Sequence, residues 1–284
     1  MEIKILFIIL ITLPALAFTS CVVSNNTSST QNVTNSTMET LKEPEGDVEF
    51  SFIVYGDNGN INPVFEKIIS EANKSDADFV VGLGDSSDGK NKKELQDVKN
   101  FLEKKLEKKY YTAIGDNDYI LEGSKRTSKA FEEVFGKKSY SFDHKGAHFI
   151  VFESTDQKDS FADEELDWLK KDLKKNTSKR NFIFMHVPIN APMSEITLGE
   201  QSELLKQQNR KFTEIVNEYK VEEIYSGHFH GYLTYDLENV PVTISGGAGS
   251  SPQFGFDPDY HYIKVDVYKN THRDEYKKIE DVAI

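Results

Sequence analysis

Cysteine is almost absent from this sequence. Cys21 is the single cysteine among 284 residues, which excludes any internal disulfide framework. Basic residues are too few to balance the acidic ones: 34 Lys and Arg stand against 47 Asp and Glu, a formal net charge of -13. That charge argues against nonspecific binding to nucleic acid or to anionic lipid, so no nucleic-acid partner is expected.

Long apolar runs are also missing, apart from one at the start of the chain. Residues 5–18 (ILFIILITLPALAF) are apolar and are interrupted by Pro14. This run is too short, and too close to the N-terminus, to favour a membrane-spanning helix over a signal peptide. Residues 1–20 are therefore predicted to be a signal peptide.

The small residues Thr19 and Ser20 precede Cys21, and the stretch FTSC resembles a lipoprotein lipobox with Phe18 in the usual place of leucine. The resemblance implies cleavage before Cys21, lipidation of its thiol, and anchoring at the outer face of the cell membrane. The alternative is an ordinary secretory signal or an uncleaved anchor, with an incidental cysteine. The lipoprotein interpretation is preferred because the one cysteine lies where it would be used.

Residues 21–47 have almost nothing to bury. They are rich in Ser, Thr and Asn, which predicts a flexible tether between the membrane and a folded domain. Asn26, Asn32 and Asn35 each begin an N-x-S/T triplet, a pattern that fits glycosylation and chance equally well in such a tract. No second linker is visible, so residues 48–284 are predicted to form one domain.

The first part of this domain alternates strands and helices. The predicted order is strand 48–56, helix 62–75, strand 78–84, helix 92–109 and strand 110–115. This order predicts an α/β fold with parallel strands covered by helices. Farther on, the patterns predict a hairpin at 139–154, helices at 162–175 and 202–219, and strands at 181–188, 221–232, 240–249 and 261–268. The last two strands are expected to close the domain, with His272 in a charged tail.

Polar residues gather where the predicted strands end. The three early strands all end in Gly-Asp and two later strands end in histidines, which gives the set Asp57, Asp85, Asp116, His186, His228 and His230. In parallel sheets, ligands bind at the carboxyl ends of the strands. Three carboxylates and three imidazoles suit Mn, Fe or Zn, and a carboxylate can bridge two ions about 3.5–4 Å apart. Each residue alone also fits a turn or a solvated rim.

In these blocks the sequence resembles the calcineurin-like metallophosphoesterases over residues 48–268. The matching segments are 57–59 (DNG), 84–88 (GDSSD), 115–118 (GDND), His186 and 227–230 (GHFH), while 160–173 and 244–249 (ISGGAG) resemble the purple-acid-phosphatase branch. The resemblance implies a four-layer α/β/β/α sandwich of two mixed sheets flanked by helices.

The resemblance also implies a dinuclear centre of two divalent or mixed-valence ions. Asp57, Asp85 and His230 would bind the first ion, and Asp116, His186 and His228 would bind the second ion, with Asp85 bridging. The reaction implied is hydrolysis of a small phosphate ester by a metal-bound hydroxide, since two cations lower the pKa of water and neutralise phosphoryl charge.

The chain departs from the family pattern at the third block. Asp116 replaces an asparagine ligand, and Asn117 replaces a histidine that in the family helps to protonate the leaving group or to hold the phosphate. Asn117 and Asp118 are therefore the candidate catalytic residues. Asparagine donates a hydrogen bond but cannot deliver a proton, and loss of a general acid costs on the order of 10²–10⁴ in rate. A catalytically impaired metal- or phospholigand-binding lipoprotein is therefore the alternative to an exported phosphoesterase.

Two further departures concern the first ion. Gly59 leaves no D-x-H ligand, and Asp88 takes the position of the tyrosine that colours purple acid phosphatases. Asp88 is expected to hold a ligand rather than to bind metal itself. Whether Asn60 reaches the ion stays open at this point.

Overall fold

The computed structural model describes residues 46–155, 163–192, 194, 201–253, 259–280 and 282. All of them fall within one compact unit, Glu43–Ile284. The predicted signal peptide, the lipidated Cys21 and most of the tether lie outside the described residues. None of the helices among the described residues combines the length and the apolar character that a membrane span requires.

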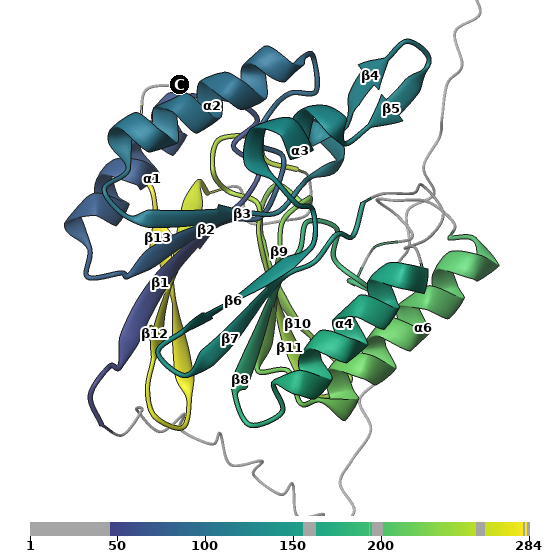
Figure 1. The fold of residues 1–284 in the computed structure, drawn as a ribbon. Helices are drawn as coiled ribbons and strands as arrows, with labels where there is room; N and C mark the ends of the chain where they lie inside the picture. Colours follow the sequence, from purple (N-terminus) through teal and green to yellow (C-terminus); the bar gives the residue numbers. More distant parts are fainter. Residues whose placement is uncertain are drawn as a thin grey trace, which may run out of the picture. The chain divides into compact units, whose positions relative to one another are not determined.

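Two mixed sheets form the centre of the fold (Figure 1). The first has the order β13 (His272–Lys278), β12 (His261–Val267), β1 (Phe50–Tyr55), β2 (Phe79–Gly82) and β3 (Lys109–Thr112). The second has the order β10 (Tyr232–Leu237), β11 (Val240–Ser245), β9 (Glu223–Ser226), β8 (Arg180–Phe184), β7 (Ala147–Val151) and β6 (Tyr140–His144). Strands β1, β2 and β3 run parallel, as do β7, β8, β9 and β11.

Helices cover the outer face of each sheet. Among the described residues, the helices are α1 (Pro63–Lys74), α2 (Lys92–Lys105), α3 (Lys129–Phe135), α4 (Asp163–Lys175) and α6 (Glu203–Glu218). Helices α1 and α2 lie on the first sheet, and α4 and α6 lie on the second. The arrangement is the predicted four-layer α/β/β/α sandwich.

Aromatic side chains fill the space between the two sheets. The ring of Phe52 on β1 is stacked on Phe79 at 5.2 Å between centroids and meets Phe149, Phe182 and Phe184 of the second sheet edge-on at 5.6–5.8 Å. Such pairs contribute about 0.5–1.5 kcal/mol each beyond the burial of their area. This contact fixes one sheet against the other, and so fixes the relative position of their strand ends.

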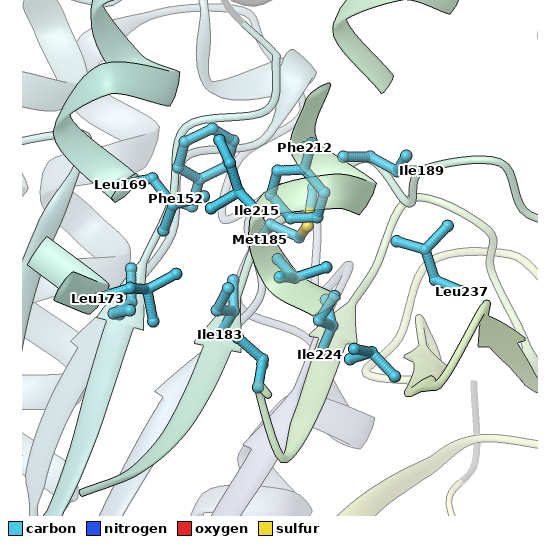
Figure 2. Close-up of a cluster of buried hydrophobic side chains, with 14 of the residues drawn as sticks. Phe152, Leu169, Leu173, Ile183, Met185, Ile189, Phe212, Ile215, Ile224 and Leu237 are labelled. Carbon is cyan, nitrogen blue, oxygen red and sulfur yellow. The ribbon is translucent and has the colours of Figure 1, made fainter. Parts of the chain in front are cut away.

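The helical layer on the second sheet has its own core (Figure 2). Leu169 and Leu173 lie one turn apart on α4, so both point at the sheet. They pack with Phe212 of α6 against Ile183 and Ile224 of β8 and β9. The amphipathic spacing in the sequence is thereby explained by burial on β8 and β9.

Local signals in the sequence set the start of α1. The side chain of Asn62 accepts a hydrogen bond from the Phe65 N–H at 3.0 Å, and Pro63 occupies the first helical position. An asparagine cap satisfies an N–H that the helix itself leaves unpaired, and proline has no N–H to lose there. The predicted helix after the first strand is confirmed.

The end of the chain differs from the prediction. The segment that contains His272 is not a charged tail but strand β13, which pairs antiparallel with β12 from His272 opposite Val267 to Lys278 opposite His261. The alternation of inward and outward side chains typical of a strand is hidden because the segment HRDEYKK is mostly charged and polar.

The prediction also missed β10, α3 and the hairpin of β4 (Ile120–Glu122) and β5 (Lys125–Thr127). The hairpin predicted at 139–154 is confirmed as β6 and β7.

Candidate metal centre

Six predicted site residues follow strands whose carboxyl ends point the same way. Asp57 follows β1, Asp85 follows β2, Asp116 opens a short 3-10 helix, η1 (Asp116–Asp118), after β3, His186 follows β8, and His228 and His230 follow β9. Because β1–β3 are parallel to one another, as are β8 and β9, each sheet brings its own strand ends together. The sandwich then brings the two sets together.

The backbone is unusual at three of these residues. Asp57, Asp85 and His228 have positive φ angles of 62°, 52° and 69°. Residues other than glycine adopt such angles at a cost on the order of 1–3 kcal/mol, and they cluster at functional sites. Hydrogen bonds hold two of them in place, since the His228 N–H donates to both carboxylate oxygens of Asp57 at 3.0 and 3.1 Å.

Two glycines allow the loops to approach one another. A Cβ atom on Gly115 would lie 2.1 Å from the backbone nitrogen and from Oδ1 of Asp85. A Cβ atom on Gly227 would lie 2.5 Å from Asp57 Oδ2. The repeated Gly-Asp and Gly-His pairs are therefore required by close packing between neighbouring strand ends.

One group of ligand atoms surrounds His186. Its Nε2 lies 3.0 Å from Asp116 Oδ1 and 3.4 Å from Asp85 Oδ1. Asp116 Oδ1 is also 3.0 Å from His228 Nδ1, which lies 3.3 Å from His186 Nε2. Atoms of Asp116, His186 and His228 lie within 4.8 Å of one another, a spacing that suits one metal ion.

The hydrogen bonds of His186 determine which nitrogen faces this group. Its Nδ1–H donates to the carbonyl oxygen of Leu83 at 2.8 Å, so Nε2 carries the lone pair in the neutral ring. Burial lowers the pKa of His186, but the charge of Asp85 and the hydrogen bond with Asp116 outweigh burial and raise that pKa well above its usual value. The space between His186, Asp85 and Asp116 therefore favours a positive charge.

A second group lies around Asp57, which is fully buried. Atoms of Asp57, Asp85 and His186 also lie within 4.8 Å of one another. His230 approaches from the other side, with Nε2 3.6 Å from Asp57 Oδ1 and its Nδ1–H bonded to the Ser251 carbonyl at 2.8 Å. Burial, ahead of the charge of Asp85, raises the pKa of Asp57 well above its usual range despite the opposing effect of His186.

The donor set fits divalent cations. In the described part of the chain, the ion pairs of Asp57, Asp85 and Asp116 are formed with histidines alone. Buried carboxylates need a compensating charge, and carboxylate with imidazole ligands suits Mn, Fe or Zn. The six residues are brought together as expected, while their assignment to particular ions stays a prediction.

The structure gives Asn117 a specific partner. Its main-chain N–H donates to Asp85 Oδ1 at 2.9 Å, and its side-chain amide donates to Asp85 Oδ2 at 2.8 Å. Asn117 therefore orients the carboxylate that is expected to bridge the ions. Its predicted catalytic role remains a prediction.

Asp118 lies behind the centre and is fully buried. It accepts hydrogen bonds from the N–H of Gly115 at 2.9 Å and of Ser87 at 3.0 Å. Burial first, and then the charge of Asp85, raises the pKa of Asp118 to about 7. The contacts tie the loop after β2 to the loop after β3.

Asp88 occupies the space next to Gly59. A Cβ atom on Gly59 would lie 2.8 Å from Asp88 Oδ1. Asp88 Oδ2 accepts hydrogen bonds from Asn60 Nδ2 at 2.9 Å and from Lys90 Nζ at 3.2 Å. Asp88 and Asn60 are thus engaged with each other, and neither belongs to the two ligand groups described above.

Some contributors to the site had no signal in the sequence. The carbonyl oxygens of Leu83 and Ser251 orient His186 and His230, and any residue type supplies a carbonyl. Arg126, which contacts the turn of Asp116, was also missed. The signal that could have found it is the basic stretch 123–129 (GSKRTSK), which lies four residues beyond the third Gly-Asp block.

A third group of ionisable residues lies between the sheets, at the amino end of β9. The side chains of Glu223, His272 and Asp274 lie within 4.8 Å of one another. An arginine always donates, so the 3.3 Å contact from Arg180 Nη2 makes His272 Nδ1 the acceptor in the neutral ring. His272 Nε2 then carries the proton, which it donates to Glu223. This group is therefore a hydrogen-bonded network that joins β9 to β13, rather than a metal site.

Comparisons with known proteins agree on the fold. A family model described as calcineurin-like phosphoesterase matches residues 50–232. No curated protein matches the sequence.

Among solved structures, purple acid phosphatase PPD1 from yellow lupin (Lupinus luteus) seeds is similar with 16% identity and a TM-score of 0.65, over 81% of this chain and 51% of that chain. The chain thus spans about half the length of the lupin protein. GAP50, described as the anchor in the inner membrane complex of Plasmodium, is similar with 13% identity and a TM-score of 0.60, over 81% of this chain and 84% of that chain.

Proposed function

Because the chain belongs to the calcineurin-like phosphoesterase family, we propose that it hydrolyses phosphate esters at a centre of two metal ions. One observation carries the proposal. Three carboxylates and three imidazoles from five strand ends converge, with His186 Nε2 only 3.0 Å from Asp116 Oδ1 and 3.4 Å from Asp85 Oδ1. In a structural sandwich without a centre, such a concentration of buried charge would only reduce stability.

In this proposal each ion has its own set of ligands. Asp57 and His230 hold the first ion, Asp116, His186 and His228 hold the second, and Asp85 is shared. When bound, two such cations lower the pKa of a water molecule and neutralise charge on the phosphoryl oxygens. The protein contributes orientation: Leu83 and Ser251 fix the two histidine rings, and Asn117 fixes the shared carboxylate.

The leaving group is where this chain differs from the family pattern. Asn117 has no proton to give, and one of its two side-chain N–H groups is already donated to Asp85. We therefore expect the best substrates to be esters whose leaving group departs without a proton. The same contact supports a second candidate function, namely a lipoprotein that binds metal or a phosphorylated ligand without turnover.

We also propose that the protein is exported and anchored to the outer face of the membrane through a lipid on Cys21. The support is the apolar run 5–18, the lipobox-like FTSC and the Ser/Thr/Asn-rich tether that follows. Cys21→Ala is expected to move the protein from the membrane fraction to the soluble fraction. A variant that stays in the membrane fraction would favour an uncleaved anchor.

The test of the enzymatic proposal uses the full chain, loaded separately with Mn, Zn and Fe. Hydrolysis of p-nitrophenyl phosphate and of its bis ester is measured for the wild type, for His230→Ala as the blank, and for Asn117→His. Turnover by the wild type above the blank supports the proposal. Turnover only after Asn117→His supports the binding function, and bound metal with no turnover in either protein rejects the enzymatic proposal.

A further inference from the structure

An arginine lies beside the centre on an element that the ligands do not use. Arg126 belongs to β5 of the β4–β5 hairpin, which follows the turn of Asp116 directly and is drawn beside α3 in Figure 1. In the hairpin Arg126 is paired with Leu121. Its side chain reaches back toward the turn from which the hairpin starts.

The guanidinium group is held on main-chain oxygens of that turn. Arg126 Nη2 donates to the carbonyl oxygen of Asp116, and Nε donates to the carbonyl oxygen of Tyr119 at 3.4 Å. The side chain of Asp116 is itself 36% exposed, so Arg126 lies at the solvent-facing side of the centre. Guanidinium has five N–H donors in a planar fork, so donors remain after these two contacts.

No carboxylate neutralises Arg126 within the part of the chain that the structure describes. Its hydrogen bonds go to carbonyl oxygens, and the residue is exposed. The neighbouring Lys129 pairs with Glu122 at 3.9 Å. In a chain of net charge -13, Arg126 is thus a positive charge with no carboxylate partner among the described residues, held on the turn that carries Asp116.

The proposed reaction needs such a charge. A phosphate monoester is a dianion, and the three carboxylate ligands would offset most of the positive charge that two divalent ions bring to the site. Asn117 carries no charge, and one of its two side-chain N–H groups is donated to Asp85. Arginine forms paired hydrogen bonds with phosphate oxygens, which are among the stronger hydrogen bonds in proteins.

We propose that Arg126 is a substrate-binding residue that donates to the non-bridging phosphoryl oxygens and makes the site selective for phosphate monoesters over diesters. The inference rests on the proposed function. Selectivity follows from charge, because the monoester presents two negative charges to the guanidinium and the diester presents one. Arg126 then supplies the positive charge that the missing histidine would have brought to the phosphoryl group.

The test compares three variants of the full, Mn-loaded chain. Arg126→Gln removes the charge but keeps an N–H donor for the turn, Arg126→Lys keeps the charge without the fork, and Lys125→Gln removes a neighbouring exposed charge as the control. Metal content is measured first. Binding of inorganic phosphate by calorimetry is measured next, followed by kcat and KM for p-nitrophenyl phosphate and its bis ester.

Arg126→Gln is expected to weaken phosphate binding about 10-fold or more and to lower kcat/KM for the monoester by about 10- to 100-fold. The diester and the Lys125→Gln control are expected to change by less than about 3-fold, the size of a screened surface charge effect. Arg126→Lys should lie between the wild type and Arg126→Gln.

Three results overturn the inference alone: unchanged phosphate affinity in Arg126→Gln, an equal loss in Lys125→Gln, or a loss of metal that accounts for the whole effect. In each of these the wild type still hydrolyses the ester, so the proposed function stands. A metal-loaded wild type that neither binds phosphate nor hydrolyses either ester rejects the proposed function and the inference together.

Discussion

Asn117 donates two hydrogen bonds to the carboxylate of Asp85, one from its main-chain N–H to Oδ1 at 2.9 Å and one from its side-chain amide to Oδ2 at 2.8 Å. The residue that breaks the family pattern at this position therefore holds the carboxylate that both ions are expected to share. A histidine in its place would offer ring nitrogens in a different position. Asn117 has no proton to donate, and the hydrogen bonds that the structure gives it fix the position of the Asp85 carboxylate.

Removing the side-chain hydrogen bond from Asn117 to Asp85 should weaken metal binding. Asn117→Ala leaves one oxygen of Asp85 without its side-chain donor, and loss of such a partner to a metal ligand typically costs about 10–100-fold in affinity. Titration with Mn or Zn followed by calorimetry measures the change. Asn100→Ala on the exposed face of α2 is the control, and an equal affinity in the two variants would show that the contact with Asp85 has no effect on the metal.

Gly115→Ala should destroy the centre through a steric clash alone. Gly115 has an ordinary φ of -102°, so alanine is not strained there, but its Cβ would lie 2.1 Å from Asp85. Gly123→Ala is the converse control, because φ is +66° and no heavy atom lies within 4 Å of the added Cβ. It should cost about 1–2 kcal/mol of backbone strain and keep its metal. Metal content after dialysis distinguishes them, and full occupancy in Gly115→Ala would contradict the geometry.

Asp57→Asn should have opposite effects on the metal-free and the metal-loaded protein. Asp57 is fully buried, and in the metal-free protein its charge is compensated only in part. Its neutral replacement should stabilise the metal-free fold on the order of 1 kcal/mol, a rise in Tm of about 2–4 °C. The same variant should lose the stabilisation that added metal gives.

The control for Asp57→Asn is Asp88→Asn, since the Asp88 side chain is 40% exposed and is engaged with Asn60 and Lys90. It should keep metal-induced stabilisation and leave the metal-free Tm nearly unchanged. Thermal melts with EDTA and with Mn measure both effects. A metal-free Asp57→Asn that melts below the wild type would show that the hydrogen bonds from His228 matter more than the buried charge.

Much of the first sheet and the convergence of the candidate ligands followed from local signals. Short apolar runs that end in Gly-Asp identified β1, β2 and β3, and helical spacing between them implied parallel strands whose ends meet. The positions of the side chains at those ends did not need separate predictions, because parallel strands bring their carboxyl ends to the same edge of the sheet. The same reasoning located His186 and His228.

Other features depend on contacts between distant segments and have no local signal. The segment HRDEYKK was expected to be a tail because its residues are mostly charged, and it becomes strand β13 through pairing with β12. His272 is half-buried there, and its Nε2–H donates a hydrogen bond to Glu223 on the other sheet. The contact of Asn117 with Asp85 likewise depends on two loops that are 32 residues apart along the chain.

The network around His272 leads to a prediction about pH. Tyr225 OH lies 2.9 Å from Asp274 Oδ1 and 3.2 Å from Glu223 Oε2, so the two carboxylates are close neighbours between the sheets. Burial first, and then the charge of Glu223, raises the pKa of Asp274 to about 8. The pKa of His272 is also raised, because the hydrogen bond and charge of Glu223 outweigh burial.

Both shifts make the fold less stable as the pH rises. A group whose pKa is higher in the folded chain than in the unfolded chain binds its proton more tightly when folded, so its stabilisation is lost as the pH rises through the folded value. For Asp274 the window runs from its ordinary 3.8 to about 8, with a slope of at most about 1.4 kcal/mol per pH unit. Asp274→Asn mimics the protonated acid and should remove this slope.

The expected outcome is therefore a crossover between two stability curves. Asp274→Asn should be close to the wild type near pH 4 and more stable than the wild type near pH 8, because an amide loses no proton as the pH rises. Urea unfolding at several pH values measures the difference, and Asp236→Asn on the exposed part of β10 is the control. Parallel curves for wild type and Asp274→Asn would mean that Asp274 is already ionised in the folded protein, with Tyr225 and His272 carrying the compensation instead.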